Sequence, residues 1–302
     1  MKTETLELAA RDGYRLAATL HDPGQPPDGA VLIAPAMGVP RRHYQPFAAH
    51  LARSGLAALT VDVRGIGGSA PERLRGFPAT LHGWGEQDLG GALDHLEARY
   101  PGVPLLWVGH SAGGQLLGLV ESPRVAAALL VAAQSGHWRL WPDLRSRLLM
   151  AGLWWLVIPL LVPVLGRLPL RLLGGGEDVP AGVALEWARW GRDRRYILAH
   201  AGPRGGMGFA QHRGPLRSYA VSDDAYAPPA TVEALAALFQ EARVEVRHVT
   251  PQEAGVERIG HFGFFRPRFE PTLWAEAVAW LRHAALTSGA PAGRSGSRTA
   301  PR

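Results

Sequence analysis

Residues 105–113 of this chain read LLWVGHSAG. The apolar run 105–108 predicts a buried strand, and the apolar spacing from Gly114 onward predicts a helix. A Gly-x-Ser-x-Gly turn between the two forces the serine into a strained backbone conformation that exposes its hydroxyl group, and its glycines let strand and helix pack closely. The stretch therefore predicts an α/β sheet with Ser111 as a nucleophile at the end of a strand. The alternative is a glycine-rich turn without chemistry.

Eight short apolar runs, bounded by glycine, proline or aspartate, predict strands. They cover residues 5–9, 14–20, 30–34, 56–61, 105–108, 125–132, 216–221 and 244–249. Helical patterns between most of the later runs, such as 44–54 and 230–241, predict right-handed crossovers and a mostly parallel sheet with flanking helices. The first two runs are too close for a crossover helix, so we expect an antiparallel hairpin that turns at residues 11–13.

Residues 135–215 interrupt this alternation between the sixth and seventh runs. We expect them to form a helical cap, or lid, on an α/β core made of residues 1–134 and 216–286. Residues 287–302 are rich in glycine, serine, alanine and proline and cannot bury a core, so we expect a disordered tail. The insertion holds six of the ten tryptophans, namely Trp138, Trp141, Trp154, Trp155, Trp187 and Trp190.

A serine hydroxyl becomes a good nucleophile when an imidazole takes its proton and a carboxylate fixes the tautomer of that imidazole. The seventh run leads into residues 222–229, SDDAYAPP, which places Asp223 and Asp224 at the carboxyl end of a strand. Of the three histidines that follow, only His261 lies in a loop after the eighth run. We therefore expect His261 as the base and one of the two aspartates as the acid. The alternative is that both aspartates cap the next helix.

The chain resembles the α/β-hydrolase superfamily from Leu6 to about Ala285. The resemblance rests on the serine pentapeptide, on residues 34–39 (APAMGV) after the third run, and on residues 62–69 (DVRGIGGS) after the fourth. It is greatest to the bacterial hydrolases grouped with serine aminopeptidases and monoacylglycerol-lipase-like enzymes. It implies an eight-stranded sheet with the triad in the order serine, acid, histidine.

The resemblance also implies individual roles. Asp224 is the expected acid because the Asp-x-x-x-Pro spacing that begins there is similar to the acid loop of the superfamily, and Asp223 is the fallback. The expected oxyanion hole consists of the backbone N–H groups of Ala112, after the nucleophile, and of Met37, in the loop after the third strand. Relatives usually carry His-Gly before the second donor, where this chain has Pro35-Ala36.

The composition excludes several other classes of protein. The chain has no cysteine, which excludes disulfides, thiolate nucleophiles and zinc-thiolate sites and fits a cytoplasmic location. The first seven residues carry two acids where a signal peptide has its apolar region, so no secretion signal is expected. The net charge of +6 comes from scattered arginines, and we expect no nucleic-acid partner. There is no His-Glu-x-x-His motif, so we expect no metal, and the triad needs no cofactor.

Residues 65–70, GIGGSA, match the dinucleotide-binding pattern and follow a predicted strand. A dinucleotide site needs a helix directly after this pattern, because the N-terminus of that helix holds the pyrophosphate. No helix is expected here, since the following residues include Pro71, Gly76 and Pro78. We interpret it as a structural turn.

Residues 148–166 carry no charge and are long enough to cross a membrane, although Pro159 and Pro163 weaken that interpretation. A single crossing would place Ser111 on one side of the membrane and the acid and base on the other. We therefore expect the segment to cover the active site, with aromatic residues that suit a hydrophobic acyl chain or fill the interior of the cap, or to lie in a membrane interface.

The sequence thus predicts a serine hydrolase that cleaves an ester or related acyl bond of a small, hydrophobic substrate. A serine aminopeptidase is the second reading, for which Glu177, Asp178 or Glu186 could anchor a substrate amine. A non-catalytic binding module with a vestigial triad is the third.

Overall fold

The computed structural model describes residues 1–120, 122–173, 175–200 and 206–288. Within these residues, eight strands form one sheet in the order β1-β2-β4-β3-β5-β6-β9-β10. The eight predicted runs are confirmed, each within three residues at either end. The strands are β1 (Lys2–Ala9), β2 (Arg15–Asp22), β3 (Gly29–Ala34), β4 (Leu56–Val61), β5 (Leu105–His110), β6 (Val125–Val131), β9 (Pro215–Val221) and β10 (Arg243–Val249).

The pairing of the strands agrees with the predicted N-terminal hairpin and mostly parallel sheet. β1 pairs with β2 and β2 with β4 in antiparallel register, and the remaining neighbours are parallel. Gly13 supplies the left-handed φ of 85° that the hairpin turn needs. Every residue of β3, β4 and β5 is buried because helices cover both faces of the sheet.

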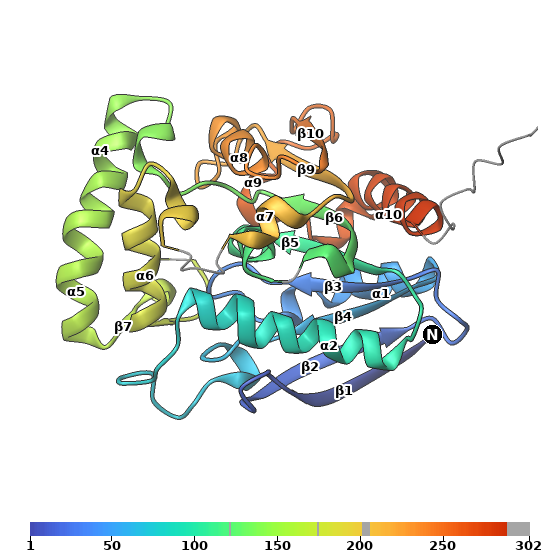
Figure 1. Cartoon of the computed structure of the whole chain (residues 1–302). Helices are drawn as coiled ribbons and strands as arrows, with labels where there is room; N and C mark the ends of the chain where they lie inside the picture. Colours follow the sequence, from blue (N-terminus) through green and yellow to red (C-terminus); the bar gives the residue numbers. More distant parts are fainter. Residues whose placement is uncertain (121, 174, 201–205, 289–302) are drawn as a thin grey trace, which may run out of the picture.

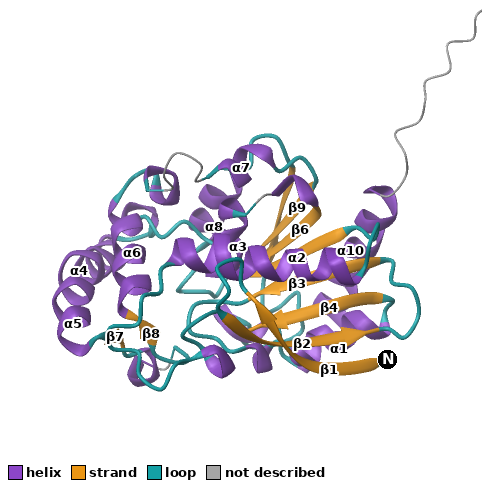
Figure 2. Cartoon of the chain, turned by 60° about the horizontal axis from the view of Figure 1, so that its bottom comes forward, coloured by secondary structure: helices purple, strands orange, loops and turns teal. Residues whose placement is uncertain are grey.

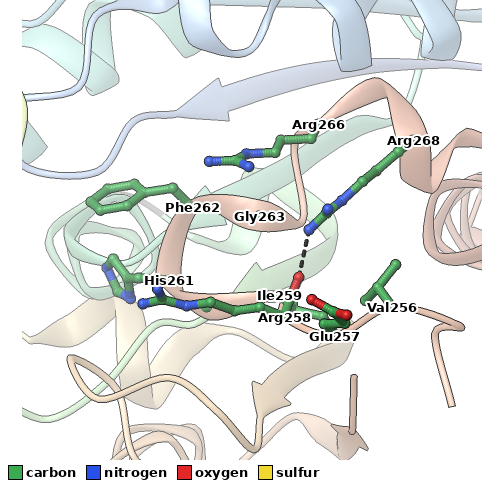
Figure 3. A pocket seen from close by; sticks show the side chains of 10 residues that line it. Val256, Glu257, Arg258, Ile259, His261, Phe262, Gly263, Arg266 and Arg268 are labelled. Atoms are coloured by element: carbon green, nitrogen blue, oxygen red, sulfur yellow. Dashed lines mark hydrogen bonds between the residues drawn. The ribbon is translucent and has the colours of Figure 1, made fainter. Parts of the chain in front are cut away.

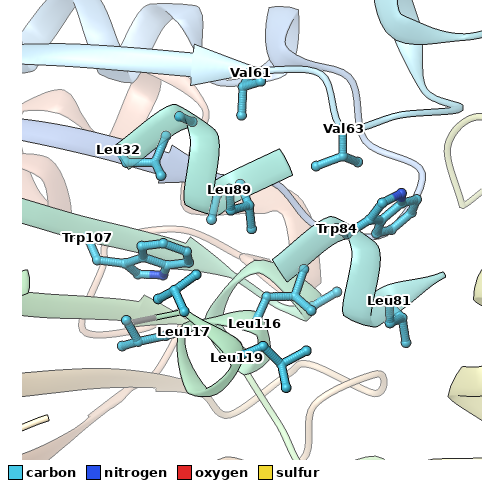
Figure 4. Close-up of a cluster of buried hydrophobic side chains, with 14 of the residues drawn as sticks. Leu32, Val61, Val63, Leu81, Trp84, Leu89, Trp107, Leu116, Leu117 and Leu119 are labelled. Carbon is cyan, nitrogen blue, oxygen red and sulfur yellow. The ribbon is translucent and has the colours of Figure 1, made fainter. Parts of the chain in front are cut away.

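The helices of the core lie in two layers on the sheet (Figures 1 and 2). α1 and α10 pack against one face, with Phe47 and Leu281 in the same buried cluster. α2 packs against the other face, where Trp107 of β5 belongs to one buried cluster with Leu89, Leu116 and Leu117 (Figure 4). The core helices are α1 (Gln45–Arg53), α2 (Gly90–Arg99), α3 (Ala112–Gln115), α8 (Pro229–Ala236), α9 (Gly260–Gly263) and α10 (Ala275–Ser288).

Among the described residues of the insertion, 135–215, the helices α4, α5 and α6 stand beside the sheet, whereas α7 packs on residues 116–119 of the core (Figure 1). α4, the π-helical turn η7 and α5 form one continuous helix, Leu144–Leu165, which by length and composition could cross a membrane. It packs along α6, which lies between it and the sheet in both views. The elements are α4 (Leu144–Gly152), η7 (Leu153–Val157), α5 (Ile158–Leu165), β7 (Arg167–Leu168), β8 (Val179–Pro180), α6 (Ala181–Arg192) and α7 (Met207–Gln211).

Two details differ from the sequence analysis. The long helix runs through both prolines: Pro159 directly follows the first residue after the π-helical turn η7, and Pro163 lies inside α5. The core was expected to end at residue 286, but α10 continues to Ser288, and Thr287 Oγ1 donates to the carbonyl oxygen of His283 at 3.0 Å. The rest of the predicted tail, 289–302, lies outside the described residues.

Candidate active site

Ser111 lies at the sharp turn between β5 and α3. Its φ of 50° and ψ of −116° are outside the regions that L-residues ordinarily adopt. A Cβ on Gly113 would lie 2.1 Å from the carbonyl oxygen of Ala34, and a Cβ on Gly109 would lie 2.5 Å from Cα of Gly114. Both glycines are therefore required by the close approach of the backbone, and the turn has the strained geometry expected of a nucleophile elbow.

His261 lies in the four-residue helix α9, within the connection that follows β10. Its Nδ1 is 2.7 Å from Oδ2 of Asp224, in the connection after β9. The other oxygen of Asp224 accepts from the backbone N–H groups of Tyr226, at 2.8 Å, and Ala227, at 3.0 Å. The carboxylate is buried and has three donors, so it can hold the imidazole ring in one tautomer and one orientation, with Nε2 as the remaining nitrogen.

Asp223, the fallback acid, has a different set of partners. Its two oxygens accept from the backbone N–H groups of Ile259, at 3.0 Å, and Gly260, at 2.9 Å. It therefore holds the backbone that carries His261, while Asp224 holds the ring. Neither aspartate caps α8, whose N-cap residue is Pro228 without a side-chain cap.

Ser111 and His261 line the same cavity, of about 230 Å³. The insertion supplies much of the wall, including Met150 and Leu153 from the inner side of the long helix. The lining is mostly apolar, so the cavity suits an acyl group better than a charged one. Its apolar residues are Ala36, Met37, Trp141, Met150, Leu153, Leu168, Leu170, Trp187, Ala225 and Phe262.

The two predicted oxyanion donors come from the serine turn and from the loop after β3. Ala112 directly follows Ser111, and Met37 lines the cavity. Among the described residues, neither backbone N–H has a hydrogen-bond partner. By contrast, the N–H of Ala36 donates to the hydroxyl oxygen of Tyr44 at 2.8 Å. Of the two N–H groups in the loop after β3, that of Ala36 is therefore occupied and that of Met37 is available to a substrate oxygen.

Sequence reasoning missed a buried chain of hydrogen bonds behind the site. Tyr44 Oη is 2.8 Å from Nδ1 of His110, and Nε2 of His110 is 2.9 Å from the carbonyl oxygen of His261. Burial, reinforced by the nearby charge of His261, holds the pKa of His110 well below its usual value, so the ring is neutral. These hydrogen bonds link the loop that contains Ala36, the residue before Ser111 and the backbone of His261. The sequence offered no signal for Tyr44.

The three acids considered as amine anchors have partners elsewhere. None of them lines the cavity that contains Ser111. Each carboxylate contacts a basic side chain: Glu177 binds Arg42 at 3.0 Å, Asp178 binds Arg167 at 2.8 Å, and Glu186 binds His82.

A separate recess of about 570 Å³ lies beside the connection that carries His261 (Figure 3). Arg258, Arg266 and Arg268 line it, and the guanidinium group of Arg268 donates to the carbonyl oxygen of Arg258. The recess does not include Ser111. It therefore cannot be the site where the serine reacts.

The turn after β4 is structural, as expected. Asp62 is buried and accepts from the backbone N–H groups of Arg41, at 2.6 Å, and Gly68, at 2.8 Å. Gly67–Ser69 forms a single 3₁₀ turn, and residues 70–80 form no helix. The dinucleotide pattern therefore lacks the helix N-terminus that a pyrophosphate needs.

Comparison with known proteins agrees with the fold. A model of the serine aminopeptidase family S33 matches residues 22–165, slightly less than half of the chain. No curated protein sequence matches the chain significantly.

Solved structures match over nearly the whole chain. A soluble variant of monoglyceride lipase from Saccharomyces cerevisiae, bound to a substrate analog, has 17% identity and a TM-score of 0.66, with 93% of this chain and 96% of that chain covered. A thermostable carboxyl esterase from Bacillus coagulans has 14% identity and a TM-score of 0.64, with 94% and 99% covered. An esterase domain from Rhodothermus marinus has 21% identity and a TM-score of 0.56, with 93% and 99% covered. These likenesses show the fold.

Proposed function

We propose that this chain belongs to the α/β-hydrolase superfamily and is a serine hydrolase that cleaves an ester of a small, hydrophobic acyl group. The observation that carries the proposal is that Ser111 and His261 line one apolar cavity while Asp224 holds Nδ1 of His261 at 2.7 Å.

In the proposed mechanism, Nε2 of His261 accepts the proton of the Ser111 hydroxyl as its oxygen attacks the ester carbonyl. The backbone N–H groups of Ala112 and Met37 donate to the oxyanion of the tetrahedral intermediate. His261 then protonates the departing alkoxide, which leaves an acyl-serine. A water molecule gives its proton to His261 and attacks the acyl-serine, and collapse of the second intermediate releases the acid and restores the Ser111 hydroxyl. Asp224 stays ionised and stabilises the imidazolium ion in both halves.

The lining of the cavity favours an ester over an aminoacyl substrate. An aminopeptidase needs an anionic group for the free amine of its substrate, and a buried ammonium without a partner is costly. No carboxylate lines the cavity in the described part of the chain, and Glu177, Asp178 and Glu186 bind basic groups elsewhere. The insertion, as the outer wall of the cavity, would act as the lid.

The test compares the wild-type protein with Ser111→Ala. We expect hydrolysis of p-nitrophenyl butyrate by the wild type, a loss of roughly 10⁴-fold or more in the variant, and covalent labelling by a fluorophosphonate probe in the wild type alone. Faster cleavage of leucine p-nitroanilide than of the ester would favour the aminopeptidase. Absence of labelling and of turnover in the folded wild type would favour a binding module.

A further inference from the structure

The long helix of the insertion, Leu144–Leu165, carries an unusual concentration of exposed apolar side chains. Among the described residues, seventeen large apolar residues are exposed, and ten of these belong to this one helix. We call its outer face the set Leu148, Leu149, Leu156, Leu160, Leu161 and Val164, each at least 50% exposed. Soluble monomers rarely expose a continuous apolar surface of this kind without a partner.

The opposite side of the helix is fixed to the protein. Trp154, Ile158 and Val162 are fully buried, and the helix packs along α6. The helix could therefore cross a membrane only if it lost its packing against α6. In the folded protein, only its outer face is available for contact with a lipid surface or a partner. In Figures 1 and 2, α4 and α5 form the edge of the molecule farthest from the sheet.

Positive charge borders the outer face. Arg145 and Arg147 lie near the start of the helix, and Arg171 lies shortly after its end. No ion pair between any of these three arginines and a carboxylate is found within the described residues. The acids beside them are already engaged: Asp143 caps α4 and Asp178 pairs with Arg167.

A basic recess adjoins the helix. It has a volume of about 1030 Å³, its lining includes Arg139, Arg192, Arg194 and Arg195, and it shares Trp155 with the helix. The guanidinium groups of this recess form a suitable site for an anion such as a phosphate.

We propose that the outer face docks on an anionic phospholipid bilayer and that the basic recess binds a lipid phosphate headgroup. The leucines would enter the boundary between headgroups and acyl chains, with Trp155 at the level of the headgroups. A second copy of this chain is the other possible cover for such a surface. It is less suitable because the arginines of one copy would face arginines of the other, while Asp143 and Asp178 are already engaged.

Docking has a consequence for the proposed ester hydrolase. Met150 and Leu153 line the cavity from the inner side of the same helix, so a docked helix would separate the cavity from lipid by about 10 Å, the diameter of one helix. This consequence rests on the proposed function, whereas docking itself does not.

The experiment is flotation of the full chain with phosphatidylcholine vesicles that contain or lack phosphatidylglycerol. The Ser111→Ala background is used so that lipolysis cannot alter the vesicles. We expect the protein to float with the anionic vesicles, and we expect Leu160→Glu to reduce the bound fraction at least tenfold. Leu286→Glu on α10 is the matched control, because Leu286 and Leu160 are both 63% exposed, and it should float like the parent.

A second pair of variants tests the recess. Arg194→Gln with Arg195→Gln should weaken binding to anionic vesicles severalfold and make it less sensitive to salt, while Arg243→Gln on β10 should have no effect. Equal flotation of Leu160→Glu and its parent, or no flotation of the parent, would overturn the proposal. A dimer in solution that Leu160→Glu dissociates, without vesicle binding, would assign the face to a second copy. Because flotation needs no turnover, these outcomes are independent of p-nitrophenyl butyrate hydrolysis.

Discussion

Asp223 and Asp224 are consecutive residues whose carboxylates hold the same segment in two different ways. Asp224 contacts the imidazole ring of His261 at 2.7 Å, whereas Asp223 accepts from the backbone N–H groups of Ile259 and Gly260 at 3.0 and 2.9 Å. One carboxylate orients the ring, and the other fixes the backbone beneath it. Substitution of each by asparagine should therefore separate chemistry from positioning.

Asp224→Asn should lower kcat by about 10³- to 10⁴-fold, because an amide stabilises the wrong tautomer of His261. Asp223→Asn keeps one acceptor oxygen and should lower kcat by about tenfold at most, with a loss of about 1–3 kcal/mol in the free energy of unfolding. Hydrolysis of p-nitrophenyl butyrate and urea denaturation measure the two effects. Equal losses of kcat in both variants would contradict the assigned roles.

Tyr44→Phe should affect both stability and activity. The substitution removes the hydroxyl that accepts from Ala36 and contacts His110, and it leaves buried polar groups without a partner. We expect a loss of about 1–3 kcal/mol in the free energy of unfolding and a severalfold fall in kcat with little change in KM. Tyr219→Phe is the control, since Tyr219 is equally buried but its hydroxyl donates to Glu276. If Tyr219→Phe lowers kcat as much as Tyr44→Phe does, the hydrogen bonds from Tyr44 to Ala36 and His110 have no special role in the reaction.

The neutral His110 should make folding sensitive to acid. Its pKa lies well below the usual value in the folded protein, mainly because it is buried, so the unfolded chain takes up a proton first as the pH falls. Its stabilising contribution is complete above about pH 6.5 and is lost progressively toward lower pH.

His110→Phe should remove that contribution while leaving the other histidines in place. Between pH 7 and pH 5, the free energy of unfolding of the variant should fall by about 1–2 kcal/mol less than that of the wild type. Urea denaturation at several pH values gives this difference in slope, which does not depend on the overall stability of the variant. Parallel pH profiles would show that His110 is protonated in the folded state.

Met150→Trp should change the acyl-chain preference. Met150 lines the cavity, and a larger side chain there reduces a space of only about 230 Å³. We expect hydrolysis of p-nitrophenyl octanoate to fall at least about tenfold, with that of the acetate within about threefold of the wild type. The matched control is Leu149→Trp, one residue away on the same helix, where the side chain is 65% exposed. Proportional losses on both esters would place Met150 outside the acyl site.

The sheet could be predicted from the sequence because its evidence is local. The strands are short apolar runs with clear boundaries, and the serine turn between β5 and α3 has a pattern that few other structures require. The order of serine, acid and histidine placed Ser111, Asp224 and His261 in connections that follow β5, β9 and β10. The catalytic roles of these residues remain predictions until the variants are measured.

The remaining features depend on contacts between distant residues. The choice between Asp223 and Asp224 depends on which carboxylate reaches His261, a separation of 37 positions for Asp224. The link from Tyr44 to His110 joins positions 66 apart. The continuity of the helix through Pro159 depends on the π-helical turn before it, for which the sequence has no recognised signal.

The two glycines of the serine turn are required by the fold and not by the reaction. A Cβ at Gly113 or Gly109 would collide with backbone atoms at 2.1 and 2.5 Å whether or not residue 111 carries a hydroxyl. A descendant of this chain that had lost the serine would still need both glycines to close its sheet against the first turn of α3. In a library selected only for folding, positions 109 and 113 should therefore stay glycine, whereas serine at position 111 should not be retained.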